Sequence, residues 1–258
     1  MQDLTCLQLP QFHPWLRRAL FQFGVRRAAR LADAIIVPSS ATKRDIVRWF
    51  RPAEEKIRVV PLAAGEHFVP LSLKESMPVL SRYELPYRDY LLFVGNVEPR
   101  KNLLALIEAY NRLRAATPLA PRLAIAGGAG WKNRLIHRAA AASPAAADIR
   151  FLGYVPEAEL PALMNGALAL VYPSIYEGFG LPPLEAMACG TPVITSNRSS
   201  LPEVVGDAAL LVDPDDRAEL ADAMARIVDQ EPLRDDLRER GLKQAQRFSW
   251  EERSEEHT

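Results

Sequence analysis

Two carboxylates eight positions apart mark the part of the chain whose residue types are best suited to chemistry. Glu177 and Glu185 flank the segment 178–184 (GFGLPPL). The glycines allow the backbone to approach a ligand closely, and the prolines suit the first turn of a helix. A helix that begins here turns free N–H groups and its positive end toward the loop, which favours a phosphate group. The spacing is equally compatible with a glycine-rich turn whose two glutamates face solvent.

A second polar segment, 95–102 (GNVEPRKN), places Arg100 next to Lys101 after a glycine turn. The forked guanidinium and the compact ammonium together suit a pyrophosphate leaving group. Cations at the start of a helix oppose the helix dipole, so they are mildly unfavourable there without an anion. The alternative interpretation of this segment is an ordinary solvated helix start.

The elements that must position these segments alternate between short apolar strands and longer amphipathic helices. This alternation predicts an α/β protein with a Rossmann-like doubly wound parallel sheet. In such sheets ligands lie beyond the carboxyl ends of the strands, so the loops after Val94, Ala126 and Tyr172 are the expected places for a site. Strands are predicted at 34–38, 57–62, 90–94, 122–126, 168–172, 192–195 and 209–212, and helices from about 42, at 103–113, at 183–189 and in one long stretch near the end.

Composition narrows the class of protein. The chain has 258 residues, of which 48% are hydrophobic and 25% charged, as in a globular protein. Its 32 basic residues balance its 32 acidic ones, which argues against nucleic acid as a partner. Cys6 and Cys189 stand far apart and the four histidines are scattered, so neither a disulfide framework nor a metal site is expected. We therefore expect a soluble, cytoplasmic protein, because no apolar run reaches the ~20 residues of a membrane span.

The two polar segments and the text around them resemble the retaining glycosyltransferases of family four, which have the GT-B fold. Glu177–Glu185 matches the Glu-x7-Glu motif of that family, and 98–102 (EPRKN) is similar to its mannosyltransferase branch. The similarity continues through 186–194 (AMACGTPVI), 199–204 (SSLPEV), 206–209 (GDAA) and 248–250 (FSW), so it covers nearly the whole chain.

The resemblance implies that a nucleotide-diphosphate sugar, with GDP-mannose favoured, binds the C-terminal domain. It also implies transfer of a hexose to a glycan or lipid-linked acceptor with retained configuration. No cofactor and no essential metal are expected, because cationic side chains and a helix end stabilise the departing diphosphate. The implied catalytic residues are Glu177, Lys101 and Arg100, and the implied donor-binding residues are Gly95, Asn96, Val155 near the base, Gly178, Phe179, Gly180, Leu181, and Glu185 on the ribose.

Two positions depart from the family pattern. Asn96 stands where the family commonly has arginine, and Gln2 precedes Asp3 where the family has histidine. These departures leave open a non-catalytic module that binds nucleotide sugars. A GT-B-fold epimerase or phosphorylase is a further alternative, although no lysine element typical of a phosphorylase cofactor site is evident.

We expect three parts along the chain. Residues 1–56 are expected to be the last part of an N-terminal acceptor domain, and 57–252 the C-terminal donor-binding domain. The segment 253–258 (RSEEHT) resembles the in-frame translation of a sequencing-adapter oligonucleotide. The expectation is a fragment that binds the donor without useful transfer, since proximity and water exclusion need both walls of the cleft.

Three further features can be interpreted as functional, and each also has a structural interpretation. Asp213 to Asp216 (DPDD) contains an Asp-x-Asp, but Asp216 followed by Glu219 predicts a capping box for a helix that begins at Arg217. The glycines of 127–130 lack the full dinucleotide-binding fingerprint. Arginines at 17, 18, 26, 27 and 30 alternate with apolar residues. They predict a surface helix, with peripheral contact at the inner face of the plasma membrane as the alternative.

Overall fold

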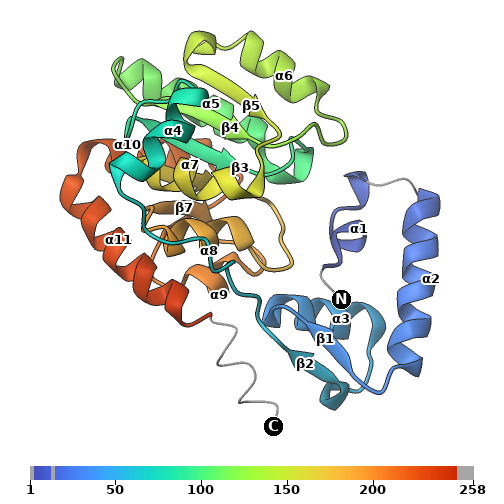
Figure 1. Cartoon of the computed structure of the whole chain (residues 1–258). Coiled ribbons are helices and arrows are strands. Elements are labelled where there is room, and N and C mark those ends of the chain that lie inside the picture. The colour runs from blue at the N-terminus through green and yellow to red at the C-terminus, as the bar shows by residue number, and fades with distance from the viewer. Residues whose placement is uncertain (1–2, 13–14, 249–258) are drawn as a thin grey trace.

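The computed structural model describes residues 3–12 and 15–248, and within them it contains two parallel sheets (Figure 1). The larger sheet has six strands in the order β5-β4-β3-β6-β7-β8, and the smaller pairs β1 with β2. The strands are β1 (Ile35–Val37), β2 (Ile57–Val59), β3 (Tyr90–Val94), β4 (Arg122–Ala126), β5 (Ile149–Gly153), β6 (Ala169–Tyr172), β7 (Val193–Ser196) and β8 (Leu210–Val212). All neighbouring strands run parallel. The predicted α/β class and the doubly wound sheet are confirmed.

Helices cover both faces of the larger sheet. One layer is formed by α4, α7, α8 and α11, and the other by α5, α6 and α10 (Figure 1). The helices are α1 (Thr5–Gln8), α2 (Trp15–Leu31), α3 (Ser40–Phe50), α4 (Leu73–Arg82), α5 (Leu103–Ala116), α6 (Arg134–Ala141), α7 (Leu160–Gly166), α8 (Leu181–Ala188), α9 (Leu201–Val205), α10 (Arg217–Asp229) and α11 (Glu231–Gln246). Every residue of β3, β6 and β7 is buried. Strands covered on both faces read as continuous apolar runs, which is why the sequence revealed them.

The order of strands reverses at the centre of the larger sheet. The chain moves outward from β3 through β4 to β5, then returns to the other side of β3 and continues through β6, β7 and β8. A reversal of this kind opens a crevice beyond the carboxyl ends of the two central strands. The loops that leave β3 and β6 are the two polar segments singled out above.

Two elements differ from the sequence-based expectation. The edge strand β5 was not predicted, because it is only partly buried and Arg150 interrupts its apolar run. The prediction of a single long final helix is wrong, since the structure has two helices there, α10 and α11. The break falls at Gln230, and Pro232 stands in the first turn of α11, where its missing N–H does no harm.

The boundary expected between residues 56 and 57 is also corrected. It separates β1 from β2, yet Ile57 lies directly opposite Ile35 in the smaller sheet. Ile57 packs with Leu4, Val37 and Ile46 in a hydrophobic cluster of its own. We call the part formed by residues 3–59 the smaller body and the part from 60 to 248 the larger body. Gln2 and the 253–258 tail lie outside the described residues.

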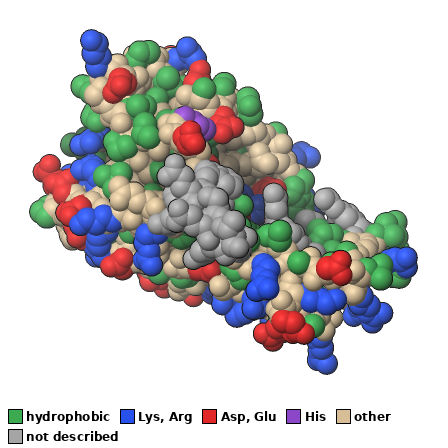
Figure 2. Space-filling model, turned by 60° about the horizontal axis from the view of Figure 1, so that its bottom comes forward, with side chains coloured by type: hydrophobic (Ala, Val, Ile, Leu, Met, Phe, Trp, Pro, Cys, Tyr) green, Lys and Arg blue, Asp and Glu red, His purple; other side chains and the backbone are tan. Residues whose placement is uncertain are grey.

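The surface of α2 combines apolar and basic side chains. Trp15, Leu20 and Phe23 are largely exposed on this helix, and Arg26 and Arg27 lie beside Phe23. Figure 2 shows hydrophobic and basic side chains close together on the smaller body, at the lower right. The part of the chain that the structure describes has no helix that is long and apolar enough to cross a membrane. Peripheral membrane contact stays a prediction.

Candidate functional site

The loops after β3 and β6 meet at the crevice, as predicted. Arg100 and Lys101 lie on a 3₁₀ turn, Pro99–Lys101, which follows β3 and leads through Asn102 into α5. Glu177 lies in the loop between β6 and α8. Because β3 and β6 are adjacent parallel strands, their carboxyl ends bring the two loops into contact.

Glu177 is the centre of a buried charged cluster. Its Oε1 lies 2.7 Å from Lys101 Nζ and accepts hydrogen bonds from the hydroxyls of Ser174 (2.6 Å) and Tyr172 (2.9 Å). Its Oε2 lies 2.7 Å from Arg100 Nη1. Burial by itself raises the pKa of Glu177, but Lys101 and Arg100 outweigh that effect and lower the pKa to about 2. The carboxylate is therefore ionised and fully paired.

The guanidinium of Arg100 is held almost entirely by protein groups. Its Nε and Nη2 donate to Glu98 Oε1 (3.1 and 2.8 Å), and Nη1 donates to the carbonyl of Tyr176 (2.8 Å) as well as to Glu177. The indole N–H of Trp131 donates to the other oxygen of Glu98 (2.9 Å). Arg100 thus joins the loops after β3 and β6. Most of its N–H groups are bonded to protein groups, whereas we expected from the sequence that they would be free for a diphosphate.

Lys101 has fewer hydrogen bonds to protein groups than Arg100. It is buried, and its ammonium donates to the Tyr172 hydroxyl and to Glu177. An ammonium has three N–H donors, so one is left over after these two contacts. Lys101 can therefore reach an anion without losing a protein partner. Arg100, whose four contacts use four of its five N–H groups, also keeps one N–H on Nη2.

The loop 177–181 turns its carbonyls into the protein. Ser200 Oγ donates to the carbonyls of Glu177 (3.0 Å) and Phe179 (2.5 Å). Among the described residues, no acceptor is found for the N–H groups of 178–181. These N–H groups lead into the first turn of α8, whose positive end faces the same loop. A helix start with free N–H groups is the geometry that the sequence predicted, and anion binding there stays a prediction.

Glu185 has the opposite environment to Glu177. It lies on α8, and no hydrogen bond to its carboxylate is found in the described part of the chain. Burial, and after it the negative charge of Glu157, raises the pKa of Glu185 to about 7. Two carboxylates whose pKa values are pushed apart indicate two different roles.

The remaining candidate residues are placed as follows. Gly95 donates its N–H to the carbonyl of Ala126 (2.9 Å), which ties the ends of β3 and β4 together. Asn96 is exposed beside this turn. The side chain of Val155 packs in the core of the larger body, whereas the neighbouring Tyr154 is 78% exposed. Tyr154 is thus the more accessible side chain near the position expected for a base.

The polar residues that complete the site were not predicted. They are Glu98, Trp131, Tyr172, Ser174 and Ser200. Their hydroxyl, carboxylate and indole groups come from four separate stretches and follow no spacing rule. The EPRKN match at 98–102 contains Glu98 and the SSLPEV match at 199–204 contains Ser200, but neither match gave these two residues a chemical role.

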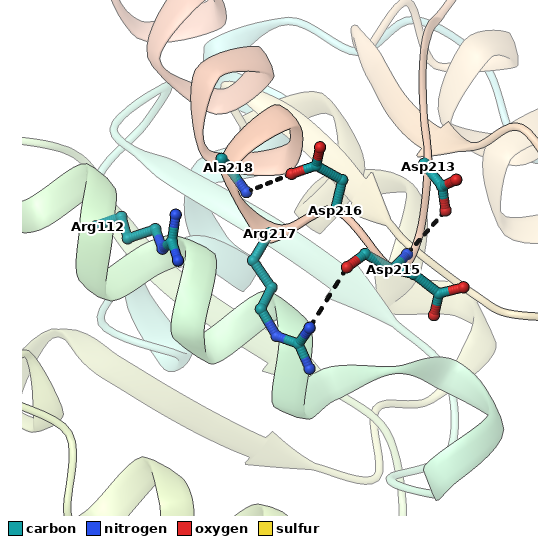
Figure 3. A pocket seen from close by; sticks show the side chains of 6 residues that line it. All are labelled: Arg112, Asp213, Asp215, Asp216, Arg217 and Ala218. Atoms are coloured by element: carbon teal, nitrogen blue, oxygen red, sulfur yellow. Dashed lines mark hydrogen bonds between the residues drawn. The ribbon is translucent and has the colours of Figure 1, made fainter.

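The aspartates at 213–216 form a helix cap (Figure 3). Asp216 accepts the N–H groups of Ala218 (2.9 Å) and Glu219 (3.0 Å), as predicted for the cap of α10. The reciprocal half differs, because Glu219 accepts the N–H of Asp213 (2.7 Å) rather than that of Asp216. Within residues 3–12 and 15–248, no group of three or more His, Cys, Asp or Glu side chains is arranged to hold a metal ion.

Comparisons with known proteins agree with this architecture. The chain is 38% identical to the O-antigen chain mannosyltransferase B of Escherichia coli, over 96% of this chain and 65% of that protein. It is 30% identical to the serotype-specific mannosyltransferase WbdA of Escherichia coli, over 93% of this chain and 29% of that protein. The chain therefore spans less than two thirds of the length of these relatives.

Among solved structures, the sucrose-phosphate synthase of Thermosynechococcus elongatus is similar, with a TM-score of 0.80 and 26% identity over 92% of this chain and 60% of that one. The model of Glycosyltransferase Family 4 matches residues 4–63. The model of Glycosyl transferases group 1 matches residues 85–244 and so covers the crevice, the charged cluster and both glutamates. The protein belongs to the glycosyl transferases group 1, and its sheet is that of a GT-B glycosyltransferase.

Proposed function

We propose that this chain binds the nucleotide-diphosphate sugar of a retaining hexosyl transfer to a glycan or lipid-linked acceptor. Mannose, carried as GDP-mannose, is the favoured sugar, because the 38% identical relative is named a mannosyltransferase. The observation that carries the proposal is the loop 177–181, whose unpaired N–H groups directly follow Glu177, the ion-pair partner of Lys101. Two carboxylates of opposite ionisation behaviour flank this loop.

We assign a role to each group. The N–H groups of 178–181 and the free N–H of Lys101 stabilise the charge that grows on the departing diphosphate. Glu177 stays ionised and places Lys101. Burial lowers the pKa of Lys101, and the charge of Glu177 opposes that effect. Glu185 accepts the two hydroxyls of the ribose, since a carboxylate without protein donors has free lone pairs. Arg100 supports the cluster by joining its two loops.

The direct test is calorimetric titration with GDP, UDP and ADP. We expect one of these to bind the wild-type chain. Lys101→Ala and Glu185→Ala are each expected to lose about 1.5–3 kcal/mol of binding free energy, the usual loss for a hydrogen bond to a charged group. This corresponds to roughly 10- to 150-fold weaker binding. The base that binds most tightly identifies the nucleotide.

Lys243→Ala and Glu239→Ala serve as matched controls, because these two residues form an exposed ion pair on α11 and are each 71% exposed. Both controls are expected to bind like the wild type. The proposal fails if no nucleoside diphosphate binds, or if both site variants bind as tightly as the controls.

Nucleotide affinity should also depend on pH through Glu185. Its pKa of about 7 means that it is largely protonated at pH 6 and ionised at pH 8. Only the ionised form accepts two hydroxyl hydrogen bonds, so affinity should rise as the pH rises through 7. Titration of the nucleotide phosphate contributes to the same range. The informative quantity is therefore the difference between wild type and Glu185→Gln, measured at both pH values; identical profiles would contradict the ribose role.

A further inference from the structure

The first turn of α3, in the smaller body, contacts the loop 177–181 of the larger body. Ser39 caps α3 by accepting the N–H of Thr42 (3.1 Å), and its own hydroxyl donates to the carbonyl of Gly178 (2.7 Å). The Thr42 hydroxyl donates to the same carbonyl (3.1 Å). Both side chains are fully buried. A single carbonyl oxygen thus receives two hydrogen bonds from residues that lie 139 and 136 positions away.

This contact determines where the next N–H points. The peptide between Gly178 and Phe179 is trans, as are all the described peptide bonds. In a planar trans peptide the C=O and the N–H point in opposite directions. Because the Gly178 carbonyl is directed at Ser39 and Thr42, the N–H of Phe179 is directed away from α3. No acceptor for that N–H is found among the described residues.

Two further contacts keep α3 in place against the loop. The carboxylate of Glu203, on α9, accepts the N–H of Ser40 (2.9 and 3.0 Å) and that of Ala41 (3.3 Å). These are N–H groups that the first turn of a helix leaves unpaired, and a negative charge is favourable there. The hydroxyl of Tyr176, beside the loop, donates to Asp45 Oδ2 (2.7 Å). A shift of α3 would therefore displace the loop as well.

We propose that Ser39 and Thr42 are positioning residues for the nucleotide-sugar diphosphate. They hold the peptide between Gly178 and Phe179 in the orientation that presents the Phe179 N–H to the diphosphate. Through them, the smaller body controls how well the larger body binds the diphosphate. The inference rests on the proposed function, and it extends the site across the contact between the two bodies.

The test compares ligands with and without the diphosphate. Two ligands are used: the nucleoside and the nucleoside diphosphate of the base that binds best. The affinity for each ligand is measured for the wild-type chain, for Thr42→Val and for the double variant Ser39→Ala/Thr42→Val. We expect the double variant to bind the diphosphate roughly tenfold more weakly, the effect of about one lost hydrogen bond. Affinity for the nucleoside should stay unchanged, because a nucleoside does not reach this peptide.

Conservative variants separate positioning from general damage. Thr42→Ser keeps the hydroxyl and should restore diphosphate affinity, whereas Thr42→Val keeps the shape and should not. Ser40→Ala is the matched control, since no hydrogen bond to the Ser40 side chain is found in the described residues. If the double variant does not fold, the comparison of Thr42→Val with Thr42→Ser decides the question.

Two results would overturn the inference while leaving the proposed function intact. One is wild-type diphosphate affinity in folded Thr42→Val and in the double variant. The other is an equal loss for nucleoside and diphosphate. If the wild-type chain binds no nucleoside diphosphate, or Lys101→Ala and Glu185→Ala both bind as tightly as the controls, the proposed function fails and the inference fails with it.

Discussion

Glu177→Gln is expected to lower the free energy of unfolding by about 3–5 kcal/mol, the usual effect of removing one partner from a buried ion pair. The substitution keeps the shape of the side chain but removes the charge that compensates Lys101 and Arg100. The effect is largest at Lys101, which loses its acidic partner, because Arg100 retains Glu98 as a second one. Urea denaturation at pH 7 measures the change.

The pH dependence of stability provides a check on the same carboxylate. Its pKa in the folded protein is about 2, below the ordinary value of 4.5. Its contribution is therefore complete above pH 4.5 and is lost as the pH falls from 4.5 toward 2. Glu177→Gln should lack that part of the acid dependence. Glu239→Ala, which removes an exposed partner on α11, should change stability by less than about 1 kcal/mol. A loss of that small size in Glu177→Gln would contradict the buried cluster.

Gly127→Ala is expected to destabilise the protein by about 2–5 kcal/mol, through backbone strain and overpacking together. Gly127 has φ +155°, and an added Cβ would lie 1.9 Å from the carbonyl oxygen of Gly95. That oxygen belongs to backbone, so the loops after β3 and β4 must separate. The turn before Arg100 and Lys101 would move with them, and nucleotide affinity should fall as well. Thermal unfolding and nucleotide titration measure the two effects.

Gly128→Ala is the matched control at the next position. There an added Cβ meets its nearest atom, Asn96 Oδ1, at 3.9 Å, and φ is not positive. We expect a change within about 0.5 kcal/mol, as for substitutions away from such features. Equal destabilisation by the two alanines would show that the approach of the two loops is not what requires glycine at position 127.

The sequence by itself determined the class of fold and the loops in which a site is expected. The runs at 90–94 and 122–126 were predicted with the boundaries that the structure has, because strands buried on both faces must be apolar throughout. The parallel arrangement places the loops after Val94 and Tyr172 at the same edge of the sheet, and the pairing of β3 with β6 in the structure brings them together. Glu177, Glu185 and Lys101 were singled out by their residue types and spacing and by the resemblance to the glycosyltransferase family. The apolar pattern that predicts a strand is weaker where the strand is only partly buried. The edge strand β5, which contains Arg150, was therefore not predicted.

Only the tertiary structure decided which protein partners and which electrostatic surroundings each site residue has. The sequence placed Arg100 on the diphosphate, but the fold supplies Glu98 and the Tyr176 carbonyl as its partners. It also drives the pKa values of Glu177 and Glu185 apart, because one carboxylate is buried among cations and the other without them. The hydrogen bonds from Ser39 and Thr42 to the carbonyl of Gly178 join parts of the chain more than 130 positions apart. Helix and strand periodicity describes local neighbours, whereas these contacts exist only once the two bodies pack together.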